Sequence, residues 1–185
     1  DKSDNLATYK VEVFSFEELQ LKKTRDYAHP GKTLTCNKCS AKFEFRSFPY
    51  AFAWACKNCN STFLVKNGTE LKSYGKLESP ESISIPIGEK GIIKGIEYEV
   101  VGYAVKEERN IYRSRWREYT LFNPAHGYAF LSEYDGHWIY LKEAPYFPVI
   151  IKSSDKEIQR NNEYFQLFNE YRYSVKIAAG EFPNN

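Results

Sequence analysis

The sequence has 185 residues, enough for one ordinary domain and a small additional module, because single-core domains usually run to about 100–150 residues. Its 26 basic and 24 acidic residues leave a formal net charge of only +2, which argues against a chain that is a nucleic-acid or membrane polyelectrolyte along its whole length. Its 15 tyrosines and 13 phenylalanines favour half-buried strand surfaces over helices. Composition therefore predicts an all-β fold.

No apolar run approaches the roughly 18 residues that a membrane helix needs, and the first ten residues lack the apolar core of a signal peptide. We therefore expect a soluble, cytoplasmic chain. Because the sequence contains no methionine, we also expect it to be a piece of a longer protein. An anchor elsewhere in that protein would place this chain on the cytoplasmic face of a membrane.

Residues 1–30 begin with an alternating run over 9–16 and continue with a segment that predicts either a short helix or a strand ending near His29. We expect this N-terminal segment to pack on one of the two modules that follow.

All four cysteines lie between residues 31 and 76 as two CxxC pairs, Cys36 with Cys39 and Cys56 with Cys59, separated by sixteen residues. This spacing is typical of a zinc ribbon, in which each tight turn supplies two thiolates to a tetrahedral ion. Iron suits the same four-sulfur geometry, but zinc needs no redox partner. Two disulfides or a thioredoxin-like redox centre are the alternatives, and neither pair has the helical context of a redox CxxC. We predict one structural metal ion, zinc.

The two cysteine pairs repeat a longer pattern, in which Phe43 and Phe63 each stand four residues after the second cysteine. Such a repeat predicts two hairpins whose returning strands bury an aromatic ring beneath the metal. The residue after each second cysteine, Ser40 or Asn60, is expected at positive φ, and because asparagine tolerates that conformation better, the second turn should be the more regular. Asn67-Gly68 predicts a two-residue hairpin turn.

The module from 31 to 76 carries eight basic residues against two acidic ones, among aromatic residues such as those of "FEFRSFPYAFAW". A nucleic-acid-binding ribbon is therefore one hypothesis. The simpler interpretation, which we prefer, is that the aromatics form the small core of a metal-stabilised module and the lysines keep it soluble.

Residues 77–82 are polar and read as a linker, and residues 83–185 then predict an antiparallel β domain that closes as a barrel or sandwich. Its expected strands are separated by glycine-containing turns and lie over 83–88, 91–95, 96–105, 112–122, 127–134 and 137–144. In the last segment, alternation predicts that Tyr171, Tyr173, Val175 and Ile177 share one face.

Arg113, Arg115 and Arg117 alternate, so on a strand they would share one face while Tyr112 and Trp116 point toward the core. Three such arginines are weak candidates for binding an acidic partner, a phosphate or a lipid head group. The commoner outcome is a solvated face paired with neighbouring glutamates, namely Glu107, Glu108 or Glu118.

Catalytic patterns are absent: the sequence has no HExxH, GxSxG or glycine-rich phosphate loop and no cysteine outside the two pairs. The residues an enzyme would have to use are Glu118, His126, Asp135 and His137, and the histidines are more typical of turn residues that bond locally. We predict that the chain is not an enzyme.

Several motifs together resemble the bacterial domain-of-unknown-function family 4178 over about residues 83–183. They are Gly88 and Gly91, the "YEVVG" of Tyr98–Gly102, Trp116 with Glu118 and Tyr119, Leu131 with Glu133, Gly136–Trp138, and the closing "GEFP" of Gly180–Pro183. The resemblance implies a β-rich domain, often preceded by a zinc-ribbon-like segment and, in longer members, followed by membrane helices. It implies no catalytic residues.

The sequence thus favours a non-enzymatic binding or scaffold module with a protein partner and a structural zinc ion. A nucleic-acid-binding protein that acts through the basic ribbon is the main alternative.

Overall fold

The computed structural model describes residues 9–14, 32–66, 70–143, 149–150, 156–160, 162–167 and 170–184, and these residues contain strands but no helix. All pairings between the strands are antiparallel, which confirms the predicted all-β class. The predicted helix or strand over 17–31 and the turn at Asn67-Gly68 lie outside the described residues.

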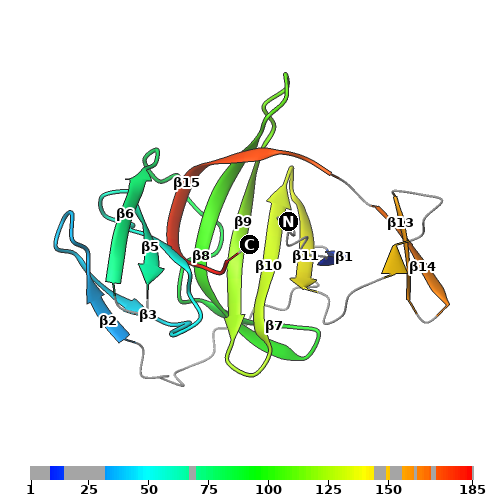
Figure 1. The fold of residues 1–185 in the computed structure, drawn as a ribbon, viewed down its shortest axis with the longest axis horizontal. Coiled ribbons are helices and arrows are strands. Elements are labelled where there is room, and N and C mark those ends of the chain that lie inside the picture. Colours follow the sequence, from blue (N-terminus) through cyan, green and yellow to red (C-terminus); the bar gives the residue numbers. More distant parts are fainter. Residues whose placement is uncertain are drawn as a thin grey trace, which may run out of the picture.

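Ten strands form one large curved sheet in the order β1-β11-β10-β9-β8-β15-β4-β5-β6, with β7 pairing β8 beside this path (Figure 1). The sheet stays open among the described residues, with β1 and β6 at its two ends. Two small sheets, β2-β3 and β12-β13-β14, are not hydrogen-bonded to it. The sheet strands are β1 (Tyr9–Phe14), β4 (Ala53–Ala55), β5 (Ser61–Lys66), β6 (Glu70–Lys76), β7 (Lys90–Ile93), β8 (Ile96–Glu108), β9 (Arg115–Asn123), β10 (Gly127–Tyr134), β11 (His137–Glu143) and β15 (Tyr173–Phe182); the others are β2 (Lys32–Thr35), β3 (Lys42–Phe45), β12 (Val149–Ile150), β13 (Glu157–Arg160) and β14 (Glu163–Gln166).

The strands from β7 to β11 form a meander because local turn chemistry joins each to the next. Lys94-Gly95 and Asp135-Gly136 both have positive φ at each residue, the conformation of the two-residue turns that suit hairpins. The strand predicted over 83–88 is wrong: this segment is irregular, and Pro86 offers no N–H to a ladder. Instead Ile85 is buried against the sheet, and Gly88 N donates to Val100 O at 2.7 Å.

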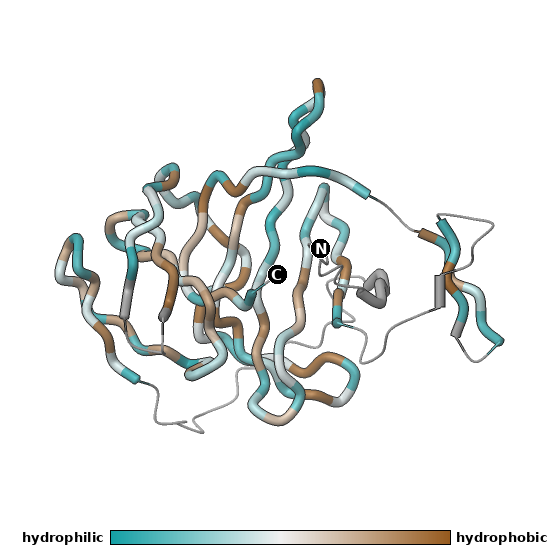
Figure 2. Tube along the Cα trace, in the orientation of Figure 1, coloured by the Kyte–Doolittle hydropathy of each residue, from teal (hydrophilic) through white to brown (hydrophobic). Residues whose placement is uncertain are grey.

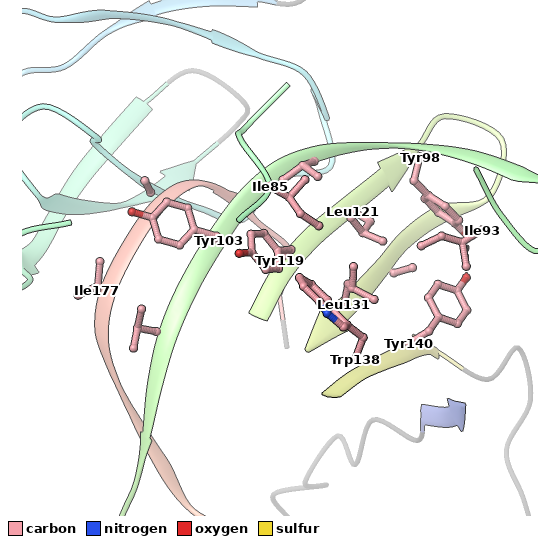
Figure 3. Close-up of a cluster of buried hydrophobic side chains, with 14 residues drawn as sticks. Ile85, Ile93, Tyr98, Tyr103, Tyr119, Leu121, Leu131, Trp138, Tyr140 and Ile177 are labelled. Carbon is pink, nitrogen blue, oxygen red and sulfur yellow. Dashed lines mark hydrogen bonds between the residues drawn. The ribbon is translucent and has the colours of Figure 1, made fainter. Parts of the chain in front are cut away.

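The main core lies on one face of the meander and is rich in aromatic residues (Figure 3). Tyr119 and Leu131 are completely buried at its centre, and the hydroxyls of Tyr98 and Tyr140 hydrogen-bond at 3.0 Å. Because these tyrosines satisfy each other, the core buries their rings without leaving a hydroxyl unpaired. The buried members are Ile85, Ile93, Tyr98, Val100, Tyr103, Val105, Tyr119, Leu121, Ala129, Leu131, Trp138, Tyr140, Ile177 and Ala179.

Strand β15 joins the two halves of the large sheet, since it pairs with β8 on one side and with β4 on the other. A bulge between Val175 and Ile177 interrupts its alternation. Ile177 is therefore buried in the core, at 1% exposure, whereas Val175 is 39% exposed. The predicted common face for Tyr171, Tyr173, Val175 and Ile177 is wrong for this reason.

Gly102 and Gly180 face each other where β15 crosses β8, and the two backbones approach too closely for side chains. A Cβ on Gly180 would lie 2.2 Å from Val101 O and 2.6 Å from Gly102 Cα, and Gly180 also has a φ of +88°. A Cβ on Gly102 would lie 2.5 Å from Glu181 O. Glycine at both positions is what allows β15 to sit in the sheet at all.

Residues 77–82 carry no strand, but the large sheet continues through β15 into β4, β5 and β6. The N-terminal strand β1 pairs along β11 from Tyr9–Glu143 to Phe14–Trp138. The domain boundaries suggested by the sequence remain predictions.

Candidate metal centre

The two cysteine pairs sit at the ends of two hairpins with the same backbone pattern. Ser40 N donates to Cys36 O at 2.9 Å, and Asn60 N donates to Cys56 O at 2.8 Å. Both turns place the residue after the second cysteine at a φ of 60°. Positive φ at these two positions is confirmed, but the expectation that the second turn is more regular is wrong, because the closing hydrogen bond sets the same conformation for serine as for asparagine.

The four sulfurs form one compact group in which all Sγ atoms lie within 4.8 Å of one another. Across the hairpins, Cys36 Sγ lies 3.8 Å from Cys59 Sγ, and Cys39 Sγ lies 3.7 Å from Cys56 Sγ. A tetrahedral ion with metal–sulfur bonds of about 2.3 Å separates its sulfurs by about 3.8 Å. All four residues are free thiols, and the two cross-hairpin contacts are far longer than a disulfide bond of about 2.05 Å. The donor set and its spacing therefore fit one tetrahedral metal ion.

An aromatic stack supports the cysteine turns. The Trp54 ring lies between Phe43, at 3.6 Å between centroids, and Phe63, at 5.3 Å. These rings belong to the same hydrophobic cluster as the buried Cys36 and Cys56. Both phenylalanines thus pack beneath the cysteines, as their repeated position predicts. Because the cluster is small, its packing alone gives the module limited stability.

The protein environment raises the pKa of two of the four thiols and lowers the pKa of the other two. Burial raises the pKa of Cys36, and it raises the pKa of Cys56 to about 12. A hydrogen bond with Asn58 lowers the pKa of Cys39 to about 6. Burial would raise the pKa of Cys59 as well, but hydrogen bonds with Ser61 outweigh it and lower that pKa. A metal ion that binds here must displace protons from the buried pair, so its affinity depends on pH.

The turn after β3 attaches the cysteine module to the rest of the sheet through Glu181 of β15. The Glu181 carboxylate is 2% exposed and accepts hydrogen bonds from Arg46 N at 2.7 Å, Ser47 N at 2.9 Å and Ser47 Oγ at 2.5 Å. Tyr128 of β10 donates its hydroxyl to Ser47 Oγ at 2.7 Å. We call Arg46, Ser47, Tyr128 and Glu181 the Glu181 latch. Burial raises the pKa of Glu181, and the hydrogen bonds from Arg46 and Ser47 oppose part of this effect.

Backbone pairing and an ion pair reinforce the latch. Phe52 N donates to Phe182 O at 2.9 Å, and Ala55 pairs with Gly180 in the β4–β15 register. The Arg46 guanidinium forms an ion pair with Glu99 of β8. The metal centre, the latch and the meander are therefore parts of one connected structure.

A comparison with protein families matches residues 86–185 to the family described as Domain of unknown function (DUF4178). The chain belongs to this family. Comparisons with curated proteins and with solved structures give no match. In this DUF4178 domain, the motif residues Tyr98, Tyr119, Leu131 and Trp138 lie in the core, and Gly180 and Glu181 make the close crossing and the latch. These motif residues therefore explain the fold.

The three candidate arginines are not brought together. Strand β9 begins at Arg115, and Arg113 lies before it in a turn with a φ of 49°. Arg115 pairs with Glu107 at 2.8 Å and Arg117 with Glu133 at 3.5 Å. Arg115 also forms ion pairs with Glu78 and Glu81, and Arg117 forms one with Glu81. The expected face of three arginines is wrong, and the two on the strand are paired with glutamates.

The expected orientation of the aromatic neighbours of these arginines is also wrong. Tyr112 is exposed at the hairpin tip, and Trp116 packs edge-on against Tyr171 at 5.0 Å, on the face opposite Tyr119 and the main core. The reason is that β9 is buried on both faces over Glu118–Phe122, so either side of the strand can accept an aromatic ring.

The residues that an enzyme would have to use are spread over the DUF4178 domain. His126 is exposed in the turn before β10, whereas His137 is exposed in the hairpin after it, so the length of the strand separates them. Asp135 lies in the β10–β11 turn, and Glu118 forms an ion pair with Lys106. A cavity of about 10 Å³ beneath β7, lined by Ile85, Ile93 and Tyr98, has room for about one water molecule.

Sequence reasoning missed the Glu181 latch. Its partners lie 134 and 135 positions apart in the sequence, so no local pattern connects them. The available signal was a lone glutamate within the apolar ending of "SVKIAAGEFP", because a buried carboxylate needs donors.

The described residues include no helix of the length and hydropathy that crossing a membrane requires.

Proposed function

We propose that this DUF4178 protein is a non-enzymatic binding or scaffold module in which Cys36, Cys39, Cys56 and Cys59 hold one structural zinc ion. The observation that carries the proposal is the group of four sulfurs no more than 4.8 Å apart, packed against an aromatic cluster. Zinc is preferred over iron because it needs no redox partner. Four thiolates complete its coordination and leave no position for substrate, so the ion stabilises the fold.

A protein partner is the second part of the proposal, and the aromatic surface of the cysteine module supports it. Phe48, Tyr50, Phe52 and Tyr74 are all exposed there. Exposed aromatic side chains of this kind are enriched in protein–protein interfaces, where they supply much of the binding energy. The paired arginines of β9 are a poorer candidate, because glutamates already neutralise them.

Cobalt substitution tests the metal assignment directly. Cobalt(II) in a tetrahedral four-thiolate site gives intense visible absorption and strong sulfur-to-metal charge-transfer bands. We expect these bands at one cobalt per chain, and we expect one equivalent of zinc to abolish them. Weak bands typical of octahedral cobalt, or no binding by the fully reduced protein, would exclude the four-thiolate site.

Nucleic-acid binding through the basic ribbon is the second candidate function. Lys38, Lys42, Lys57 and Lys72 are exposed on the module that carries the exposed aromatic rings, and Lys32 Nζ lies 5.2 Å from the centre of the Phe48 ring. Lysines with aromatic rings suit single strands, which stack on the rings and bind less tightly as salt rises. Anisotropy of a labelled single-stranded oligonucleotide separates the candidates: no binding at low salt removes this one and leaves the protein-partner proposal intact.

A further inference from the structure

The β8–β9 hairpin extends beyond the body of the sheet and ends in an apolar tip, seen at the top of Figures 1 and 2. Ile111 is 88% exposed and Tyr112 is 80% exposed, the two highest values among the exposed large hydrophobic residues of the described chain. Both side chains stand at the apex of a narrow hairpin, and the protein leaves them in solvent at a cost in free energy.

Hydrogen bonds hold the tip in this conformation. The Asn110 side-chain oxygen accepts from Tyr112 N at 3.0 Å and from Arg113 N at 2.9 Å. Below it, Glu108 N donates to Ser114 O at 3.0 Å, and Arg109 N donates to Arg172 O at 2.8 Å. The apolar pair is therefore presented by an ordered turn, and docking it would require little further ordering.

Three arginines lie in or beside this tip. Arg109, Arg113 and Arg172 are exposed, and none has an ion pair with another described residue, in contrast to Arg115 and Arg117 lower on the hairpin. Glu108 and Glu170 are the acidic residues nearest to them in the sequence, which leaves one excess positive charge. The apolar pair must therefore supply most of any binding, with a modest contribution from charge.

We propose that the tip of the β8–β9 hairpin docks on anionic membrane surfaces. Ile111 and Tyr112 enter the boundary between head groups and acyl chains, and the three arginines contact lipid phosphates. A protruding apex with two apolar side chains suits a soft surface that can close around it. A protein partner would need to bury about 800 Å² on this side for a standard interface, which a narrow tip offers poorly.

The docking is weak and reversible. Each inserted side chain contributes about tenfold to the association constant, and the excess charge contributes about fivefold on an anionic surface. The product of these factors is an association constant of about 500 M⁻¹ in lipid, below the roughly 10⁴ M⁻¹ of a single myristoyl chain. Half of the protein should therefore bind at about millimolar lipid.

Sedimentation of the full chain with vesicles tests the proposal, which does not depend on the zinc site. The vesicles are phosphatidylcholine alone or phosphatidylcholine with about a third phosphatidylserine. We expect binding to the anionic vesicles at millimolar lipid and about fivefold weaker binding to the neutral ones. A variant carrying Ile111→Ser and Tyr112→Ser should bind about a hundredfold less, because it removes both inserted side chains.

A variant carrying Tyr134→Ser and Tyr164→Ser removes two other exposed tyrosines and is the matched control. We expect it to bind like the unchanged protein. A variant carrying Arg109→Gln and Arg113→Gln should lose the preference for anionic vesicles while keeping the binding to neutral ones. If the unchanged protein stays in the supernatant at millimolar anionic lipid, or if the Ile111 and Tyr112 variant sediments as well as the control, the proposal is wrong.

Discussion

Replacing Glu181 with alanine should weaken the attachment of the cysteine module to the DUF4178 domain. The change removes the acceptor of three hydrogen bonds, from Arg46 N, Ser47 N and Ser47 Oγ, and leaves these donors without their partner. Hydrogen bonds to a charged group contribute about 1.5–3 kcal/mol each. Because Glu181→Ala also removes a carboxylate whose burial is itself unfavourable, part of this loss is offset. We therefore expect a net destabilisation of about 3–5 kcal/mol.

Glu181→Gln should cost less, about 1–2 kcal/mol, because the amide keeps one acceptor oxygen and carries no charge that must be buried. Ser47→Ala should cost a similar amount, because it removes a donor to Glu181 and the acceptor of the Tyr128 hydroxyl. In the double-mutant cycle of Glu181→Ala and Ser47→Ala, the two changes should couple by about 1–2 kcal/mol.

Urea unfolding of the zinc-loaded protein, followed by tryptophan fluorescence, measures these differences. Trp54 lies in the cysteine module, whereas Trp116 and Trp138 lie in the DUF4178 domain. Glu163→Ala, at an exposed position on β14, is the control. If Glu181→Ala and Glu163→Ala have the same unfolding midpoint and slope, the Glu181 latch contributes nothing to the stability of the protein.

The stability that the Glu181 latch contributes should depend on pH, because the pKa of Glu181 is raised in the folded protein. Burial raises the pKa of Glu181 above its ordinary value of 4.5, so the folded protein binds the proton more tightly than the unfolded chain. The stability of the unchanged protein relative to Glu181→Gln should therefore rise as the pH falls through the folded pKa toward 4.5. A relative stability that falls over this window would show that the carboxylate is favoured in the folded state.

Three further changes test other parts of the structure. Gly180→Ala should destabilise the protein by more than about 4 kcal/mol, because its Cβ would lie 2.2 Å from Val101 O. The control is Gly136→Ala, where nothing lies within 4 Å of the added Cβ, and it should cost only the roughly 1–2 kcal/mol of a left-handed conformation. Thermal unfolding compares the two variants. Glu107→Gln should remove a contribution to stability that is lost in acid. Hydrogen bonds to Arg115 and Lys176 lower the pKa of Glu107, so the stability that its carboxylate gives above pH 4.5 is lost as the pH falls through the folded pKa. The melting temperatures of the unchanged protein and of Glu107→Gln should therefore converge in acid. Cys56→Ser should abolish stoichiometric zinc binding, measured by mass spectrometry under native conditions, whereas Ser73→Ala, at an exposed position on β6, should retain it.

Local chemistry made much of the meander predictable. The strand predicted over 127–134 matches β10 residue for residue, and Asp135-Gly136 forms the expected turn before β11. The CxxC spacing likewise led to four sulfurs that meet, because each pair needs only its own hairpin turn to bring two sulfurs together. These features depend on contacts between residues that are close in the sequence.

Long-range pairing was not predictable in the same way. Strand β15 lies between β8 and β4, and the bulge beside Val175 changes which of its residues face the core. No local signal fixes that register, which depends on the close passage of Gly102 and Gly180. Arg113 does not lie on the expected strand face. Its N–H donates to the Asn110 side-chain oxygen in the preceding turn, and this contact competes with strand pairing.

One zinc ion, held by four thiolates and linked to the sheet through the Glu181 latch, is the central feature proposed for this protein. Elemental analysis of the purified, reduced protein, combined with thermal unfolding before and after a zinc chelator, tests this claim most directly. We expect close to one zinc per chain and, after its removal, loss of the ordered Trp54 environment of the aromatic stack. Metal-free protein whose four thiols stay reduced and whose melting temperature is unchanged by the chelator or by added zinc would contradict the account.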